Sequence, residues 1–274
     1  MEKKDKPVDN MLSAVPGNWV FSKTVSNSFD SHVRKSVPCY EEVQWMIVKL
    51  SDFFVRERGC VYDIGMSTGE TLKLLAKHHE AKKDVKFIGV DQSPSMVEVA
   101  REKCKNFDNI SLFHRDAMQM ERFDSADFII ALYTLQFLSF DQRYELISRI
   151  YNNLHCGGAF VYVDKIFGQN PECEYLYNEI HWDFKKEQGL NDEMILSKSR
   201  SLRSVLMPMT VSQNFKMLRK AGFTTFELFF KWMNFTGFLA IKTEPSLSNL
   251  KKDLHNQNTS INQSNFFNKE NLNE

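Results

Sequence analysis

Two glycines and two acidic residues stand where an α/β protein could bind a nucleoside-containing ligand. The segment 63–70 (DIGMSTGE) places Gly65 and Gly69 between a predicted strand and a predicted helix. Glycine allows a tight turn and lets a ligand approach the backbone closely. Asp91 ends the next predicted strand, where a carboxylate can accept hydrogen bonds from both hydroxyls of a ribose. Asp116 closes the third strand and is placed to contact an adenine amino group.

The residues around the two glycines indicate which ligand this turn would take. A dinucleotide-binding turn would have glycine at the positions of Ser67 and Glu70. The Glu70 carboxylate would also repel a pyrophosphate at a helix N-terminus, which otherwise favours anions. S-adenosylmethionine has no phosphate and carries a sulfonium cation, so acidic and hydroxyl neighbours suit it. We therefore expect S-adenosylmethionine as the cofactor, although a glycine turn alone also occurs in proteins that bind no nucleotide.

Short apolar runs alternate with amphipathic stretches in the region that would position these residues. This alternation is typical of a parallel sheet with helices on both faces. The sequence predicts an α/β, Rossmann-like fold of the S-adenosylmethionine methyltransferase type, with a mostly parallel, doubly wound sheet, an antiparallel edge pair and helical additions. The predicted strands are 60–63, 85–91, 110–114, 127–132 and 159–163, the helices 70–79, 95–104 and 142–154, and the edge pair 225–230 and 235–241. The glycine pair 157–158 is predicted to form the turn before the fifth strand.

The chain divides into three predicted regions. Residues 1–39 form an N-terminal segment or lid, and residues 40–244 form the cofactor-binding catalytic domain with a helical insertion at about 166–221. Residues 245–274 are polar and rich in asparagine, so they contain too little apolar surface to repay ordering. We expect this tail to be disordered.

Composition excludes several classes of function. Hydrophobic residues make up 42% of the chain and charged residues 26%, and the formal net charge is zero. The balanced charge argues against direct binding to nucleic acid. The five cysteines contain no C-x-x-C pair, so we expect no metal and a reducing, cytoplasmic location. The longest apolar run is too short to span a membrane, so we expect no membrane partner.

Several segments together resemble the bacterial carboxy-S-adenosyl-L-methionine synthases. They are 35–40 (KSVPCY), 61–67 (VYDIGMS), 91–94 (DQSP), 134–138 (TLQFL), 183–185 (DFK) and 220–223 (KAGF). The resemblance implies a homodimer that converts S-adenosylmethionine to its carboxy derivative with prephenate, upstream of tRNA wobble-uridine modification. It also implies cofactor contacts at Tyr40, Gly65, Met66, Ser67, Asp91, Gln92, Asp116 and Ala117.

Two positions depart from the family pattern. Leu132 stands where the family has asparagine, and Ser199 where an arginine binds the added carboxylate with two hydrogen bonds. Serine is a poor substitute for that arginine, which predicts little or no carboxylated product. Arg200 lies one residue later, and a local irregularity in the helix would bring it back to this role.

The function that these observations favour is an S-adenosylmethionine-dependent transferase, with methyl transfer to a small molecule as the first expectation. The alternatives are carboxy-S-adenosylmethionine synthesis, with Arg200, Lys198 or Arg203 holding the carboxylate, and a non-catalytic cofactor-binding subunit. Tyr133 and Arg200 are the candidate substrate residues. The side chains that could act as a base are Tyr133, Asp164, His181 and Trp182. Each would equally suit a packing role, so we assign no catalytic base.

Overall fold

The computed structural model describes residues 23–120 and 125–244. The predicted tail, 245–274, and most of the predicted N-terminal segment lie outside the described residues. The helices and strands of the described residues all belong to the unit Met1–Lys242. None of the helices in the described part of the chain is long and apolar enough to cross a membrane.

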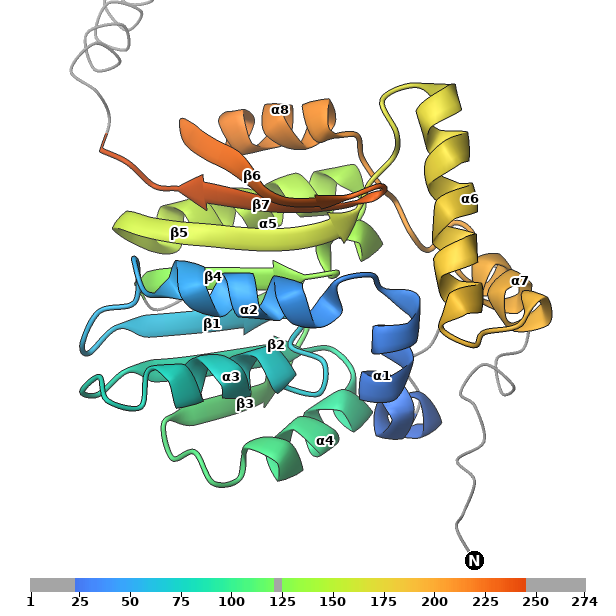
Figure 1. Ribbon diagram of the computed structural model, residues 1–274. Coiled ribbons are helices and arrows are strands. Elements are labelled where there is room, and N and C mark those ends of the chain that lie inside the picture. Colours follow the sequence, from blue (N-terminus) through green and yellow to red (C-terminus); the bar gives the residue numbers. More distant parts are fainter. Residues whose placement is uncertain (1–22, 121–124, 245–274) are drawn as a thin grey trace, which may run out of the picture. The chain divides into compact units, whose positions relative to one another are not determined.

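A sheet of seven strands forms the centre of this unit (Figure 1). Its order is β3-β2-β1-β4-β5-β7-β6, and β7 runs antiparallel to both of its neighbours. This confirms the predicted parallel sheet and its antiparallel edge pair. The bounds are β1 Cys60–Ile64, β2 Lys86–Asp91, β3 Ile110–His114, β4 Ala126–Leu132, β5 Leu154–Lys165, β6 Thr225–Trp232 and β7 Phe235–Ile241.

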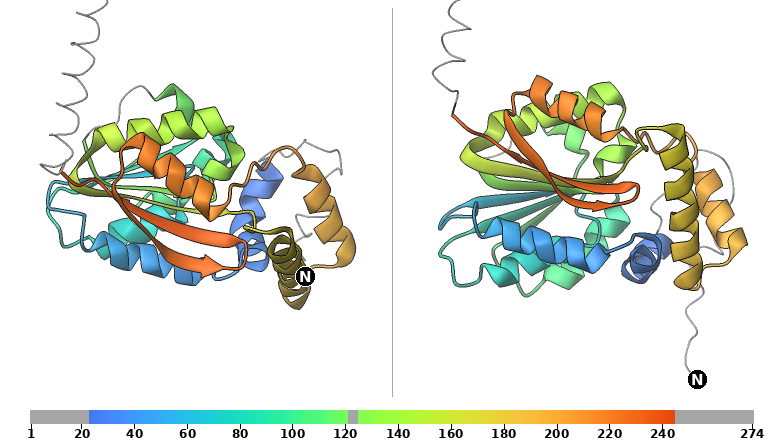
Figure 2. Two further views of the ribbon diagram at one scale, coloured as in Figure 1. Left: turned by 90° about the horizontal axis from the view of Figure 1, so that it is seen from above. Right: turned by 45° about the horizontal axis from the view of Figure 1, so that its top comes forward.

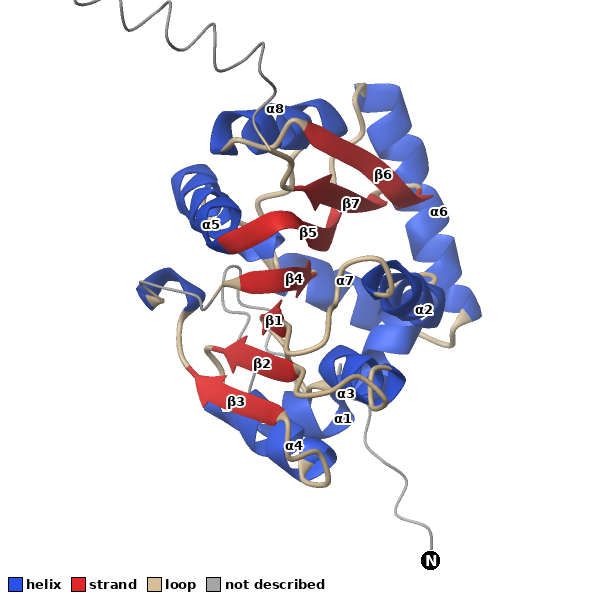
Figure 3. Ribbon diagram, turned by 90° about the vertical axis from the view of Figure 1, so that its left-hand side faces the viewer, coloured by secondary structure: helices blue, strands red, loops and turns tan. Residues whose placement is uncertain are grey.

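Helices cover both faces of the sheet and one of its ends. Figure 3 shows α2 and α3 on one face and α5 and α8 on the other. Helices α1, α6 and α7 gather beyond one end of the strands (Figures 1 and 2). The bounds are α1 Lys23–Ser36, α2 Tyr40–Ser51, α3 Glu70–His78, α4 Pro94–Cys104, α5 Phe140–Asn153, α6 Pro171–Glu187, α7 Asp192–Ser201 and α8 Val211–Ala221, with short 3-10 turns η2 Ala117–Gln119 and η3 Leu135–Phe137.

The central strand β1 explains why the sheet needs both helical layers. All five of its residues are buried. Side chains alternate between the two faces of a strand, so Val61 packs with α2 and α3, whereas Tyr62 and Ile64 pack on the side of α5 and α8. A strand buried on both faces is typical of parallel sheets. The order of connections reverses between β1 and β4, and ligands of such sheets bind at that point beyond the carboxyl ends of the strands.

The prediction for the start of β5 was wrong. The strand begins at Leu154, directly after α5, and includes both predicted turn glycines. Leu154 pairs with Ala126, and the register then shifts between Ala126 and Phe128. Gly157 absorbs this irregularity with a φ of 82°, and its N–H donates to the carbonyl of Lys242. The glycines therefore accommodate a bulge within the strand.

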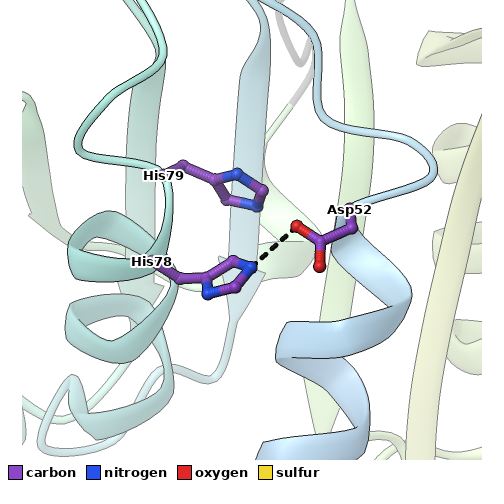
Figure 4. A group of neighbouring side chains, drawn as sticks. All are labelled: Asp52, His78 and His79. Atoms are coloured by element: carbon purple, nitrogen blue, oxygen red, sulfur yellow. Dashed lines mark hydrogen bonds and ion pairs between the residues drawn. The ribbon is translucent and has the colours of Figure 1, made fainter.

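A polar cluster joins the C-terminal ends of α2 and α3 (Figure 4). His78 Nε2 lies 2.7 Å from Asp52 Oδ1, and the buried His79 places Nε2 2.7 Å from Ser51 Oγ. Burial lowers the pKa of His79 to about 4, so its ring is neutral at physiological pH. Asp52, His78 and His79 are residue types that ligate metals, and their ligand atoms lie within 4.8 Å of one another. However, His79 is already bonded to Ser51, so we assign this cluster to helix packing.

Candidate active site

The glycine turn after β1 has the backbone conformation that the sequence predicted. Gly65 has a φ of 73°, and a Cβ atom there would lie 2.2 Å from Thr134 Oγ1. Only glycine satisfies both conditions. Ser67 also has a positive φ, 53°, and its N–H donates to Asp91 Oδ2 over 2.9 Å. The turn is therefore fixed against the end of β2.

Asp91 is held in place by backbone donors. Its Oδ2 accepts from the N–H of Ser67 and its Oδ1 from the N–H of Ser93, 2.8 Å away. Burial raises the pKa of Asp91, while these two hydrogen bonds oppose the rise. A carboxylate has lone pairs beyond the two that these donors use, so it can still accept from a ribose diol. Asp63, at the end of β1, is buried beside it, and burial together with the charge of Asp91 raises the pKa of Asp63 to about 8.

One cavity of about 950 Å³ collects the predicted cofactor residues. Its volume is at the upper end of the range for small-molecule sites. Asp116 lines it from the N-cap of η2, where its side chain accepts from the N–H of Met118 over 2.8 Å. All eight predicted cofactor residues line this cavity: Tyr40, Gly65, Met66, Ser67, Asp91, Gln92, Asp116 and Ala117. The donor set suits S-adenosylmethionine, because carboxylates and hydroxyls surround the glycine turn.

Helix α1 and the start of α2 cover the cavity. Phe29, His32 and Ser36 line it from α1. Tyr40 is the first residue of α2, and its ring stacks on that of Tyr133 with centroids 6.2 Å apart. Burial raises the pKa values of both phenols, so both remain protonated. These elements therefore line one side of the cavity with aromatic side chains.

Positively charged side chains line the same cavity from β5, α6, α7 and the turn after α7. They are Lys165, Lys185, Lys198 and Arg203. Burial lowers the pKa of Lys165, whose ammonium lies 3.4 Å from Asn178 Oδ1. Glu174 and Glu179 are the acidic residues among the α6 side chains of the cavity. We call these four side chains the cationic wall, which gives the cavity positive charge suited to an anion; Arg115 lines the cavity beside Asp116.

The remaining predicted residues are divided between the cavity and other places. Tyr133, His181 and Trp182 line the cavity, as do Leu132 and Ser199. Arg200 is exposed on α7 and is not among the residues that line it. Asp164 is buried outside the lining, where burial raises its pKa to about 7.

His181 is unsuited to act as a base. Its Nε2 lies 2.9 Å from the carbonyl oxygen of Ser36, to which it donates. Burial, reinforced by nearby lysines, lowers the pKa of His181 to about 2. A ring that resists protonation this strongly cannot take a proton from a substrate near neutral pH.

The sequence analysis named Lys198 and Arg203 as candidates for holding a carboxylate, and both line the cavity, but it missed Asp63, Lys165 and Lys185 as site residues. Asp63 did carry a signal, because an acid at the end of a wholly apolar strand has no packing role. Lys185 belongs to the 183–185 segment of the family resemblance, which gave it no role, and Lys165 carried no signal, since lysine at a strand end is ordinary in any soluble protein.

Comparison with known proteins identifies the fold. Residues 61–158 match the model of a methyltransferase domain family. The apo form of the S-adenosylmethionine-dependent methyltransferase SibL superposes with a TM-score of 0.58 at 18% identity, over 86% of this chain and 62% of that one. Human N-acetylserotonin methyltransferase in complex with S-adenosylmethionine gives a TM-score of 0.56 at 16% identity, over 88% and 64%. At these identities the likeness shows the fold, which is that of the S-adenosylmethionine-dependent methyltransferases.

Curated relatives narrow the family. A carboxy-S-adenosyl-L-methionine synthase from Staphylococcus epidermidis is 40% identical over 228 residues, which cover 83% of this chain and 98% of the relative. Another from Desulfotalea psychrophila is 34% identical over 247 residues, covering 89% and 99%. The chain therefore belongs to the carboxy-S-adenosyl-L-methionine synthase family, and it is an S-adenosylmethionine-dependent transferase.

Proposed function

We propose that this enzyme makes carboxy-S-adenosylmethionine from S-adenosylmethionine and an acidic donor, prephenate. The observation that carries the proposal is the cationic wall, because a carboxylated donor and a carboxylated product both need positive charge in the cavity. With an uncharged methyl acceptor, only the carboxylate of S-adenosylmethionine itself would need to be balanced. The proposal places the adenosine and the methionine part at the glycine turn, Asp91 and Asp116, and the donor acid against Lys198 and Arg203.

The proposed reaction balances without an added oxidant. A carbon–carbon bond forms between the sulfonium methyl carbon and the carboxyl carbon of the donor. The methyl group gives up one proton, and prephenate loses its ring carboxyl group and a hydroxide ion and becomes aromatic. The hydroxide takes up the methyl proton and leaves as water. The product gains a negative charge beside the sulfonium. The residues of this chain contribute by orienting both reactants, by covering them with the aromatic side chains of Tyr40 and Tyr133, and by stabilising carboxylates with Lys198 and Arg203.

Arg200 keeps its place as a candidate substrate residue in this proposal. It is exposed and does not line the cavity of its own chain. It could contact the new carboxylate if a second copy of the chain presents it, which agrees with the homodimer that the family resemblance implies. Exposed apolar side chains on α6, among them Tyr175, Leu176 and Ile180, provide a surface on which two copies could pack.

Methyl transfer to a small molecule is the second candidate. It is favoured by Leu132, which places an apolar side chain in the cavity where the family has asparagine. Leu132 with Phe137 and Leu138 would suit an apolar acceptor. A non-catalytic role stays open only if neither reaction occurs.

Product analysis separates the candidates. The purified enzyme is incubated with S-adenosylmethionine, with and without prephenate, and the adenosine-containing products are identified by mass spectrometry. We expect a product heavier by one carbon dioxide unit that requires prephenate. Lys198→Met should slow its formation about tenfold or more, since a hydrogen bond between charged groups is worth about 1.5–3 kcal/mol. Formation of S-adenosylhomocysteine with a small acceptor, and no carboxylated product, would favour methyl transfer.

The remaining expectations on partners and location belong to the same proposal. The zero net charge supports a small-molecule substrate and no direct binding to nucleic acid. Five free cysteines, of which Cys156 is exposed, support a reducing compartment such as the cytoplasm. Light scattering on the purified protein would test the homodimer.

A further inference from the structure

One face of α1 carries a histidine and a serine that point to the same place. His32 and Ser36 are one helical turn apart, and both are buried and line the cavity. Ser36 Oγ lies 3.0 Å from His32 Nε2, and it also donates to the backbone carbonyl of His32 over 2.8 Å. Because the hydroxyl proton is used by that carbonyl, the serine oxygen can accept a hydrogen bond from another donor.

Lys198 reaches this pair from α7. Its ammonium donates to Ser36 Oγ over 3.1 Å and is also hydrogen-bonded to His32 Nε2. An ammonium group only donates, so His32 must present an unprotonated Nε2 and carry its proton on Nδ1. Two acceptors on α1 therefore fix the position of a lysine that belongs to a different helix.

We propose that His32 is a positioning residue that holds Lys198 against the carboxylate of the acidic substrate. The inference rests on the proposed function, which places that carboxylate at the cationic wall. A lysine side chain loses about 2 kcal/mol of rotamer entropy when it is fixed, so an ammonium anchored before binding costs the substrate less affinity. His32 does this while remaining neutral, and so adds no charge of its own.

The position of α1 connects this anchor to the cofactor half of the cavity. Two residues before His32, Asp30 accepts from Thr68 Oγ1 over 2.6 Å, and Thr68 lies in the glycine turn. Lys103 Nζ of α4 lies 2.5 Å from Asp30 Oδ2. The helix that positions Lys198 is thus tied to the turn that receives S-adenosylmethionine.

Two substitutions at His32 test the inference, one that removes the hydrogen-bond acceptor and one that retains it. His32→Phe keeps a ring of similar size but removes the acceptor, whereas His32→Gln retains an acceptor at the end of its side chain. We expect His32→Phe to raise the KM for prephenate about tenfold. The kcat and the Kd for S-adenosylmethionine should change less than about twofold, and His32→Gln should restore most of the loss. His155→Gln, which replaces a histidine outside the cavity lining, is the control.

A double-mutant cycle distinguishes an effect of His32 through Lys198 from a general disturbance of the structure around the cavity. If His32 acts through Lys198, then His32→Phe added to Lys198→Met should raise the KM no further than Lys198→Met alone. Additive effects would overturn the inference. So would an equal loss of S-adenosylmethionine affinity in His32→Phe, or failure of His32→Gln to rescue.

The proposed function and the inference can fail separately. If the wild-type enzyme forms no carboxylated product, the proposed function fails. The double-mutant cycle is then measured as the Kd for prephenate, by calorimetry on each variant saturated with S-adenosylmethionine. A non-additive cycle there supports the inference, and an absence of prephenate binding overturns both.

Discussion

Replacing Asp63 with asparagine tests how a buried acid takes part in cofactor binding. Asp63 is 2% exposed and lines the cavity beside Asp91, and burial raises its pKa to about 8. At pH 7 its carboxyl is therefore mostly protonated when no ligand is bound. S-adenosylmethionine brings a sulfonium and an ammonium group, which favour the ionised form. We expect cofactor binding to be accompanied by release of the Asp63 proton.

The size of the effect follows from the pKa. A carboxyl with a pKa of about 8 is ionised in about one molecule in eleven at pH 7 and in about ten of eleven at pH 9. If the cofactor binds only the ionised form, its apparent Kd falls about tenfold between these pH values, which is about 1.4 kcal/mol. Asp63→Asn cannot ionise, so its affinity should follow only the titration of the ligand and of other groups.

Isothermal titration calorimetry at pH 7, 8 and 9 measures the difference. The ratio of wild-type to Asp63→Asn affinity cancels the titration of the ligand's own amino group. That ratio should rise about tenfold across the range. A constant ratio would refute the reasoning, because it would mean that Asp63 does not change its ionisation on binding.

The same group predicts a dependence of stability on pH. The pKa of Asp63 in the folded protein lies above its ordinary value of 3.8, so between about pH 4 and pH 8 the folded state holds a proton that the unfolded chain has released. The free energy of unfolding without ligand should therefore decrease as the pH rises through this interval. Asp63→Asn should reduce that decrease in urea titrations.

Three further changes have defined outcomes. Asp164→Asn should stabilise the protein more at pH 8 than at pH 5, because burial raises the pKa of Asp164 to about 7 and the wild-type carboxyl must ionise in the folded protein above that pH. Urea denaturation at both pH values measures this. Lys103→Met should weaken S-adenosylmethionine binding by about 1 kcal/mol, because it removes the ion pair that ties Asp30 of α1 to α4. Lys105→Met removes only an exposed ion pair with Glu102 and should not change the Kd; equal Kd values for the two variants would contradict this. Deleting residues 245–274 should leave the melting temperature and the cofactor Kd unchanged, and a fall of several degrees would show that the tail docks.

The sequence predicted those structural features that are determined by residues close together in the chain. The apolar runs predicted the parallel strands because such strands are buried on both faces. The turn at Gly65 and Asp91 predicted residues that line one cavity, because both positions follow strand ends. The start of β5 failed because a bulge opposite Ala126 let the chain pair earlier than the glycines suggested.

The sequence named Lys198 and Arg203 as candidates for holding a carboxylate, but the contact of Lys198 with α1 could not be predicted in this way. His32 and Lys198 are far apart in the sequence and meet only because α7 packs near α1. No periodicity or motif encodes that contact. The direction of Arg200 depends on the phase of α7, which one residue changes by about 100°.

The last prediction concerns Arg200 and uses a mixture of two variants, each of which lacks one residue that the proposed reaction needs. Arg200→Ala lacks the exposed arginine, and Asp91→Ala lacks the ribose contact. If the arginine acts on the cavity of a second copy, each variant alone should form little carboxylated product. After the two are unfolded and refolded together, about half of the dimers contain one of each, and one of the two sites in such a dimer has both residues. About a quarter of the wild-type activity should return. If Arg200 serves its own chain, no mixture restores activity, and α7 must then move when substrate binds.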